Sequence, residues 1–387
     1  MLPAARKQIA YYTINDPHDK RSWSGITYYL GRTLQQHVGD VDYLGPVPIP
    51  WLLDKACRAL QKTSRALLRS EWIPKYSLLK NLYAAWYLRR RMRGKRYDFV
   101  LAPAAAPELA YLRTTVPIVY FGDATYKIYS ETYAREFANL GWLSRWEGNH
   151  LEHRSLHKSR FAILTSNWAA DSARRHYHLP ANRVEVMLLG ANIEQAPPPE
   201  VVYQKLQNPT LTLLFLAVDW ERKGGPLAFE ALEALHRQGI AARLVVCGCV
   251  PPPTFQHPGL EVIPFINKNL PADLALFERL LSTAHFLLLP TRADCSLLVA
   301  MEASSYGMPT IATRVGGVPD VVLDGINGYC LPLEAPGAAY AAQIAELWAD
   351  PARYQQLIHA SRQRFDQELS WTRWARQFQE ALVRHGL

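Results

Sequence analysis

The chain has few cysteines and no long apolar run, and both shortages narrow the kinds of protein it can be. Its 387 residues include five cysteines and no Cys-x-x-Cys pair, which argues against a disulfide framework and against a zinc site. The longest apolar runs, 211–218 and 285–290, are far shorter than the roughly 20 residues that span a bilayer. No G-x-G-x-x-G occurs, so a nicotinamide-dependent Rossmann enzyme is not expected. No signal peptide is recognisable, and a cytoplasmic location is expected.

Acidic residues are nearly missing from one window. Between Lys55 and Arg96 there are thirteen basic residues and one acid, so this window carries +12 while the whole chain carries +9. Five of these cations recur every three or four residues, which predicts one stripe along a helix: Lys55, Arg58, Lys62, Arg65 and Arg69. Leu53, Ala56, Leu60 and Leu67 fall on the opposite side of that helix.

Three interpretations of this basic window remain open. It is a surface helix whose apolar side packs on the N-terminal domain, or it docks on an anionic membrane at the inner face of the plasma membrane, or it binds a phosphorylated or acidic acceptor directly. The membrane is the preferred hypothesis. Nucleic acid is not an expected partner, because a nucleic-acid binder would leave the motifs described below without a use.

Strand-like apolar runs alternate with helical patterns throughout the chain, which predicts α/β architecture with parallel sheets. The runs are continuous rather than alternating, as expected when helices cover both faces of a sheet. Six strand-like runs precede a Pro-rich segment at 196–210 and six follow it. We therefore expect an N-terminal Rossmann-like domain at 1–195, a linker at 196–210 and a second Rossmann-like domain at 211–365, followed by a final helical segment at 366–387.

The most informative stretch is 287–329. Asp294 precedes a helix predicted from about Cys295 to Tyr306, and Glu302 lies eight residues further, so both carboxylates share roughly one face. After the next strand, Gly316 and Gly317 allow backbone N–H groups to approach a phosphate closely. Upstream, Arg222 and Lys223 follow a strand and enter a helix through Gly224-Gly225, which together with the helix N-terminus makes an anion site.

These motifs resemble the donor-binding region of the retaining, GT-B-fold glycosyltransferases of family 4. The matching residues are Pro290-Thr291, Asp294, Glu302-Ala303, Gly307-Met308-Pro309, Gly316-Gly317-Val318-Pro319-Asp320 and Asp324-Gly325-x-Asn327-Gly328. Two features depart from the family pattern. The first acid is Asp294 instead of Glu, and Ser296-Leu297 replaces the usual Phe-Gly, which puts the identity of the donor sugar in doubt.

The resemblance implies a GT-B fold, with two Rossmann-like doubly wound domains facing across a cleft. It also implies that a hexose-type sugar moves from a nucleoside diphosphate, with UDP or GDP expected, to a glycan or lipid-linked acceptor, with no metal and no other cofactor. Lys223 and Arg222 would stabilise the leaving diphosphate, and Asp294 would orient the sugar. Asp123, after strand 117–121, would face the reacting centre.

Further donor contacts follow from the same resemblance. Glu302 would bind the ribose, and Lys268 the ribose or base. The remaining donor-binding residues would be Gly25, Ser296, Leu297, Leu298, Gly316 and Gly317. The alternatives are a phosphorylase or a sugar-nucleotide epimerase on the same fold, or a non-catalytic relative that binds glycan or membrane. The one D-x-D, Asp40-Val41-Asp42, lies in a strand-like run and is interpreted as structural.

The resembled fold also implies that the helix at 370–385 returns to the N-terminal domain. Truncation after Asp366 is therefore expected to destabilise that domain as well.

Overall fold

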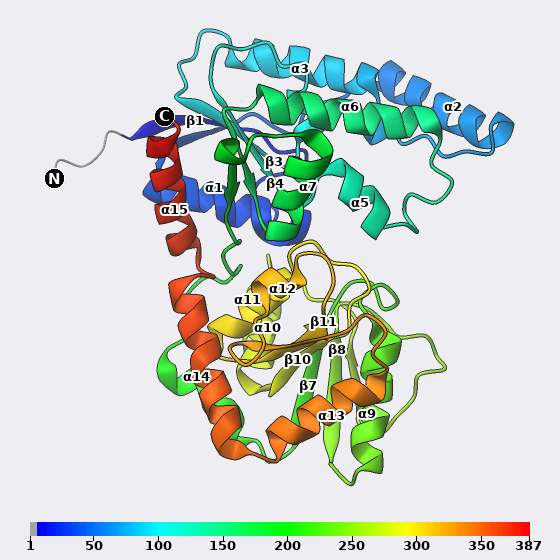
Figure 1. Cartoon of the computed structure of the whole chain (residues 1–387), viewed down its shortest axis with the longest axis vertical. Coiled ribbons are helices and arrows are strands. Elements are labelled where there is room, and N and C mark those ends of the chain that lie inside the picture. Colours follow the sequence, from blue (N-terminus) through cyan, green and yellow to red (C-terminus); the bar gives the residue numbers. More distant parts are fainter. Residues whose placement is uncertain (1–5) are drawn as a thin grey trace. The chain divides into compact units, whose positions relative to one another are not determined.

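The computed structural model describes residues 6–387, and these residues form two compact units. Unit 1 comprises the chain up to Met187 together with Ala375–Leu387, and unit 2 comprises Leu188–Trp374. Each unit contains a six-stranded parallel sheet with helices on both faces (Figure 1). The expected α/β class with two Rossmann-like doubly wound sheets is therefore confirmed.

The sheet of unit 1 has the strand order β2-β1-β3-β4-β5-β6. Strands β3, β4 and β5 are buried along their whole length, because helices cover both of their faces. The order reverses between β1 and β3, which makes a topological switch point there. The strands are β1 Lys7–Tyr11, β2 Gly39–Tyr43, β3 Phe99–Pro103, β4 Ile118–Gly122, β5 Phe161–Leu164 and β6 Val184–Val186.

The helices of unit 1 mostly connect consecutive strands. They are α1 Ile26–His37, α2 Trp51–Leu67, α3 Leu78–Met92, α4 Ala106–Leu109, α5 Tyr126–Thr132, α6 Trp142–Lys158 and α7 Asn167–Tyr177, with the 3-10 turns η1 Ser22–Gly25, η2 Pro74–Tyr76 and η3 Ala181–Arg183. Helix α2 ends at Leu67, so Arg69, which the spacing placed on the helix, lies beyond it with a φ of +49°. Asp40 and Asp42 lie in β2 and pair with Arg6 and Lys95, which is a structural role.

The sheet of unit 2 has the strand order β12-β11-β10-β7-β8-β9, the arrangement of a dinucleotide-binding Rossmann sheet. Its switch point lies between β7 and β10, which pair in parallel with Leu214 opposite Leu287. The strands are β7 Leu211–Leu216, β8 Ala242–Cys247, β9 Leu260–Ile263, β10 Phe286–Leu289, β11 Thr310–Thr313 and β12 Gly328–Leu331.

The segment that we expected to be a linker, 196–210, lies inside unit 2, whose boundary with unit 1 falls at Met187. The reason is the side chain of Lys205, which is buried and donates hydrogen bonds to the carbonyls of Val202 and Tyr306, both at 2.7 Å. The helices of unit 2 are α8 Pro199–Val202, α9 Gly225–Arg237, α10 Pro271–Thr283, α11 Leu298–Ser305, α12 Val318–Val321, α13 Gly337–Trp348 and α14 Pro351–Gln367, with the 3-10 turn η4 Gln204–Gln207.

Helix α15, Trp371–Arg384, begins in unit 2 and ends in unit 1. Within unit 1, the fully buried ring of Phe378 meets Phe99 of β3 edge-on, with ring centroids 5.7 Å apart. At its end, Arg384 forms an ion pair with Glu185 at 2.8 Å. The C-terminal residues are therefore part of the core and of the surface of unit 1.

Replacement of Phe378 by alanine is expected to destabilise unit 1 by about 3–5 kcal/mol, because it removes a buried aromatic ring and leaves a cavity beside β3. Denaturant unfolding followed by near-UV circular dichroism would measure this loss. The variant Val383→Ala, at an exposed position of the same helix, serves as the control and should unfold like the wild type. Equal stability of the Phe378→Ala variant and the control would contradict this packing.

Candidate functional site

Two loops follow the strands at the switch point of unit 2. One loop follows β7 and carries Arg222 and Lys223, and the other follows β10 and carries Asp294. Because β7 and β10 are parallel neighbours, their carboxyl ends lie at the same edge of the sheet, where ligands bind in open α/β folds. Two motifs about 70 residues apart in the sequence are thereby brought together.

The two loops pack on each other through backbone groups. Gly224 has a φ of +77°, and a Cβ there would lie 1.9 Å from the carbonyl oxygen of Pro290, so only glycine fits. The Arg292 N–H donates to the Arg222 carbonyl at 2.8 Å, and the Arg222 guanidinium donates to the Ala293 carbonyl at 3.1 Å. These contacts fix the position of Lys223 relative to Asp294.

The Lys223 ammonium and the Asp294 carboxylate form an ion pair, and their side chains are only 15% and 10% exposed. The other carboxylate oxygen of Asp294 accepts the Leu297 N–H at 3.1 Å. Burial acts to raise the pKa of Asp294, but the Lys223 ammonium, the Leu297 N–H and the Arg222 guanidinium outweigh it and bring the pKa below the ordinary value. Asp294 is therefore ionised at neutral pH and neutralises Lys223.

Glu302 lies on α11 and is 1% exposed at its side chain. Its Oε1 accepts a hydrogen bond from the Lys268 ammonium at 2.7 Å, while its Oε2 has no hydrogen-bond partner among residues 6–387. Burial raises the pKa of Glu302, and Lys268 opposes that shift. A buried carboxylate oxygen without a donor is costly, and a ligand hydroxyl would satisfy it.

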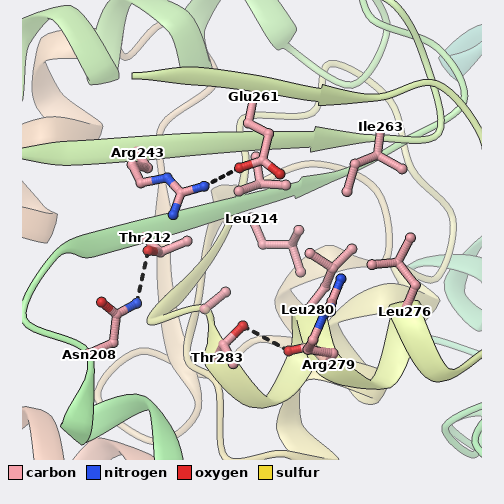
Figure 2. A pocket seen from close by; sticks show the side chains of 12 residues that line it. Asn208, Thr212, Leu214, Arg243, Glu261, Ile263, Leu276, Arg279, Leu280 and Thr283 are labelled. Atoms are coloured by element: carbon pink, nitrogen blue, oxygen red, sulfur yellow. Dashed lines mark hydrogen bonds and ion pairs between the residues drawn. The ribbon is translucent and has the colours of Figure 1, made fainter. Parts of the chain in front are cut away.

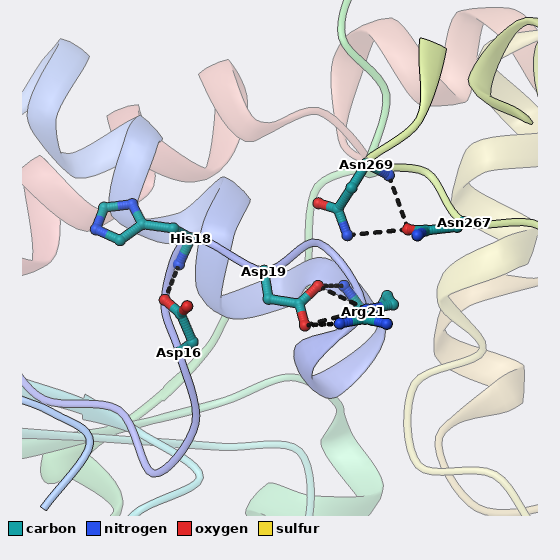
Figure 3. A network of polar contacts seen from close by, with 6 residues as sticks. All are labelled: Asp16, His18, Asp19, Arg21, Asn267 and Asn269. Carbon is teal, nitrogen blue, oxygen red and sulfur yellow. Dashed lines mark hydrogen bonds and ion pairs between the residues drawn. The ribbon is translucent and has the colours of Figure 1, made fainter. Parts of the chain in front are cut away.

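Lys268 sits in a short polar turn that precedes α10. The Asn267 carboxamide oxygen accepts the Asn269 N–H at 3.1 Å (Figure 3). The Asn267 N–H donates to the Asp273 carboxylate at 2.7 Å. The Lys268 ammonium also lies 4.1 Å from the centre of the Phe277 ring. The turn fixes the backbone of Lys268, and the contact with the Phe277 ring holds its side chain where the ammonium reaches Glu302.

The loop that follows Asp294 explains why α11 begins at Leu298, three residues later than we expected from the sequence. Leu297 has a φ of +29°, a conformation that favours glycine, and its side chain is buried. The pattern that the sequence resembles has glycine at this position, and glycine adopts a positive φ at little cost, whereas here a leucine adopts it. Ser296 and Leu298 are also buried, and they flank Leu297 at the start of α11.

Two glycines after β11 pack against the backbone of the Asp294 loop. Gly316 has a φ of +55°, and a Cβ there would lie 2.0 Å from the Asp294 carbonyl oxygen. The Gly317 N–H donates to that carbonyl at 3.2 Å. The structure therefore brings Arg222, Lys223, Asp294 and the two glycines together, with the Lys268–Glu302 pair on the neighbouring turn and helix.

Gly25 and Asp123 belong to unit 1, each after a strand. Three successive residues before α1, Trp23, Ser24 and Gly25, have positive φ values of 46°, 55° and 87°. In the preceding loop the Arg21 guanidinium pairs with both carboxylate oxygens of Asp19 (Figure 3). Such a run of left-handed residues is costly and typical of functional loops.

Glu108 of α4 was missed by the sequence analysis. It is buried at the carboxyl end of β3, its Oε2 has no hydrogen-bond partner within residues 6–387, and burial raises its pKa to about 7. The signal in the sequence was its position just after a predicted strand. It lies beside the switch point of unit 1, on the same edge of the sheet as Asp123 and Gly25.

A cavity of about 440 Å³ in unit 2 lies apart from these motifs (Figure 2). It opens between α10 and the sheet, where Arg243 of β8 pairs with Glu261 of β9, near the amino ends of those strands. None of the predicted site residues lines it. Across residues 6–387, no group of three or more His, Cys, Asp or Glu side chains is placed to hold a metal ion.

Each unit is a doubly wound α/β domain, and the paired ionic groups of unit 2 lie at its switch point, where folds of this class bind ligands. The family model described as "Glycosyltransferase Family 4" matches residues 27–195, and the model described as "Glycosyl transferases group 1" matches residues 210–350. The chain therefore belongs to the family 4 glycosyltransferases.

Curated relatives match part of the chain. The alpha-maltose-1-phosphate synthase of Mycobacterium tuberculosis is 32% identical over a segment that covers 37% of this chain and 41% of that protein. The D-inositol 3-phosphate glycosyltransferase of Corynebacterium glutamicum is 29% identical over 45% of this chain and 46% of that protein. The matched segments thus span less than half of these relatives.

Solved structures match nearly the whole chain. Sucrose-phosphate synthase from Thermosynechococcus elongatus has a TM-score of 0.69 at 18% identity and covers 98% of this chain and 99% of that one. Anabaena HepE in complex with UDP-glucose has a TM-score of 0.64 at 14% identity, with 98% and 100% covered. These similarities show that the fold is GT-B.

Proposed function

We propose that the chain transfers a hexose-type sugar from a nucleoside diphosphate to a glycan or lipid-linked acceptor, with retention of configuration and without a metal ion. The observation that carries the proposal is the buried Lys223–Asp294 pair at the switch point of unit 2. In the absence of a donor the two charges neutralise each other. When a donor binds, Lys223 would meet the diphosphate and Asp294 the hydroxyls of the sugar.

The chemistry of sugar transfer fits these groups. Breaking the bond between the anomeric carbon and the diphosphate oxygen leaves positive charge on the sugar and builds negative charge on the diphosphate. The fixed cations Lys223 and Arg222, together with the Gly316 N–H, would lower the barrier by stabilising that negative charge. They supply the charge that a metal ion would otherwise supply, which supports a metal-independent reaction.

The carboxylates are placed for binding rather than for attack on the sugar. Asp294 is paired with Lys223, and Glu302 is buried with one oxygen bound by Lys268 and the other, without a partner among residues 6–387, proposed to accept a ribose hydroxyl. Neither is a free nucleophile, so the proposed retention would take the route without a glycosyl-enzyme intermediate, in which the acceptor attacks on the face that the diphosphate leaves. Holding the sugar and the ribose at two points would also orient the donor for reaction.

A thermal-shift screen of uridine, guanosine and adenosine diphosphates tests the donor assignment. A ligand that binds only the native state raises the unfolding temperature. We expect a shift with UDP or GDP that is smaller in the Glu302→Gln variant. No shift with any of the three nucleotides at millimolar concentration would contradict a nucleoside diphosphate donor.

We also propose that unit 1 attaches to an anionic membrane, at the inner face of the plasma membrane, where a lipid-linked acceptor would be found. The support comes from α2, whose apolar side does not pack on unit 1: Leu60 is 50% exposed and Leu67 77% exposed. The side that packs carries Cys57, the one buried residue of α2, and the partly buried Leu53, Asp54, Gln61 and Ser64. Helix α2 therefore presents an apolar stripe to solvent beside its cations Lys55 and Lys62.

Other apolar side chains of unit 1 are exposed as well. On α3 and α6 they recur at helical spacing: Leu79, Leu82 and Trp86, and Trp142, Leu143 and Trp146. The start of α6 lies beside the end of α2, because the Gly141 N–H donates to the Glu71 carbonyl at 2.8 Å. Tryptophan, leucine and cations on one surface are the composition of an interfacial membrane contact. Over residues 6–387, no helix has the length and apolarity to cross a bilayer.

Co-sedimentation with vesicles tests this attachment. We expect binding to vesicles with phosphatidylserine that falls with added salt, because each cation near the surface contributes about 1 kcal/mol before screening. Replacing Arg58, Lys62, Arg65 and Arg69 by glutamine should weaken binding at least ~10-fold. The double variant Leu60→Ser/Leu67→Ser should also weaken it, whereas Val383→Ser, at another exposed apolar position, should not. Absence of binding at low salt would contradict the proposal.

A further inference from the structure

A hollow of about 1160 Å³ on unit 1 is lined by cations. It lies between the end of α3 and the segment that precedes β4. The lining residues are Trp86, Arg89, Arg90, Met92, Arg93, Lys95, Arg113, Thr114, Thr115 and Val116. Five of these ten residues are basic and none is acidic, so the hollow is a concave surface of one charge.

Most of this positive charge is not neutralised by the protein. Lys95 forms an ion pair with Asp42 at 2.6 Å, and the Arg90 guanidinium lies 5.7 Å from the centre of the Trp86 ring. Arg89, Arg93 and Arg113 form no ion pair with any acidic group among residues 6–387. Three guanidinium groups around one hollow repel one another, and an anion bound between them would relieve that repulsion.

The end of α3 does not by itself explain the cluster. The carbonyl groups at a helix C-terminus favour cations in the last turn, which accounts for Arg89 and Arg90. Arg93 lies beyond the helix, and Arg113 comes from a separate segment some 20 residues later in the sequence. Two independent segments therefore bring arginines to the same hollow.

We propose that this hollow is a binding site for a phosphate group. Guanidinium groups are planar donors that bind phosphate oxygens in pairs, which is why arginine is preferred at phosphate sites. The hydroxyl of Thr114 accepts the Val116 N–H at 3.0 Å and so keeps its own proton to donate. Trp86 and Met92 give the hollow an apolar side for the organic part of a ligand.

The position of the hollow separates it from the proposed transfer reaction. The end of α3 leads into β3, and Thr114–Val116 lead into β4, so the hollow lies at the amino ends of these strands. Gly25 and Asp123 follow strands and lie at the opposite, carboxyl edge of the same sheet. The phosphate bound here is therefore not the donor diphosphate. Its source is either the head group of a phospholipid or a soluble phosphate compound.

Calorimetric titration with inorganic pyrophosphate at low salt tests the site. The titration uses the Lys223→Ala variant, so that the proposed donor site does not contribute. Adding Arg89→Gln, Arg93→Gln and Arg113→Gln should weaken pyrophosphate binding at least tenfold. Adding Arg135→Gln, Arg237→Gln and Arg376→Gln, which removes the same charge from exposed positions outside the hollow and α2, should leave it within twofold. All six side chains are exposed, so both sets should keep the unfolding temperature of their parent.

Vesicles with phosphatidic acid identify the source of the phosphate. If the hollow takes a lipid head group, the variant with three substitutions in the hollow should lose more vesicle binding than the control variant, which has lost the same charge at Arg135, Arg237 and Arg376. If the hollow variant loses pyrophosphate binding but binds vesicles as well as the control variant does, the ligand of the hollow is a soluble phosphate compound. If the hollow variant and the control variant bind pyrophosphate equally well and bind vesicles equally well, the hollow is not a phosphate site. Because neither measurement depends on sugar transfer, this result is independent of the proposed activity.

Discussion

Replacement of Lys223 by alanine is expected to lower kcat by ~100-fold or more while the protein stays folded. The reason is that Lys223 supplies a fixed, mostly buried cation at the place where the leaving diphosphate gains charge, and the loss of one such contact typically costs at least that much. The measurement is steady-state release of the nucleoside diphosphate from the donor, together with the unfolding temperature of the variant.

Two further variants separate catalysis from stability. Burial acts to raise the pKa of Asp294, and Lys223 is the main group that opposes this shift. Without Lys223 the pKa of Asp294 should therefore rise, and the protein without a bound donor should lose stability. The double variant Lys223→Ala/Asp294→Asn avoids the unpaired carboxylate and should recover stability but not turnover. Lys223→Arg keeps the charge and should retain part of the turnover. A folded Lys223→Ala protein with the wild-type rate would refute the diphosphate role.

Replacement of Glu302 by glutamine is expected to weaken binding of the free nucleoside diphosphate at least ~10-fold, because hydrogen bonds to a charged group contribute about 1.5–3 kcal/mol. The change keeps the shape of the side chain and removes the charge that pairs with Lys268. Isothermal titration with the nucleotide measures the effect directly and does not depend on an acceptor.

The pKa of Glu302 adds a pH dependence to the same prediction. Because burial raises that pKa above the ordinary value, the carboxylate takes up a proton at a higher pH than a free glutamate does, and nucleotide affinity should fall as the pH decreases through that range. The Glu302→Gln variant should not show this fall. Glu261→Gln, which removes the same charge from an exposed ion pair of unit 2, should bind like the wild type. Unchanged affinity in the Glu302→Gln variant would rule out its ribose role.

Much of the fold could be predicted because continuous apolar runs identify parallel strands that helices cover on both faces. The twelve strands found in the two sheets correspond to the twelve runs in the sequence. Spacing predicted that Asp294 and Glu302 share roughly one face, but α11 begins at Leu298, so Asp294 lies in the loop before the helix. Spacing could not show that each has its own lysine partner, because Lys223 and Lys268 reach them from other segments of the chain.

Other features depended on contacts between distant residues. The Pro-rich segment 196–210 looked like a linker, but the buried ammonium of Lys205 ties it to the end of α11 through the Tyr306 carbonyl. Helical spacing correctly predicted an apolar side for α2, but it does not say whether that side meets protein or solvent. The side of α2 that carries Cys57 packs on unit 1, and Leu60 and Leu67 are exposed.

The most direct test of the proposed function is the fate of a labelled nucleotide sugar, followed by NMR at the anomeric carbon. With a panel of glycan and lipid-linked acceptors, in the presence of a chelator and without added phosphate, an α-linked UDP- or GDP-hexose should be consumed and give an α-linked product on one of the acceptors together with the nucleoside diphosphate. A β-linked product would contradict retention. Consumption only when inorganic phosphate is present, with formation of a sugar 1-phosphate, would show a phosphorylase and contradict the transfer of sugar to a glycan or lipid-linked acceptor.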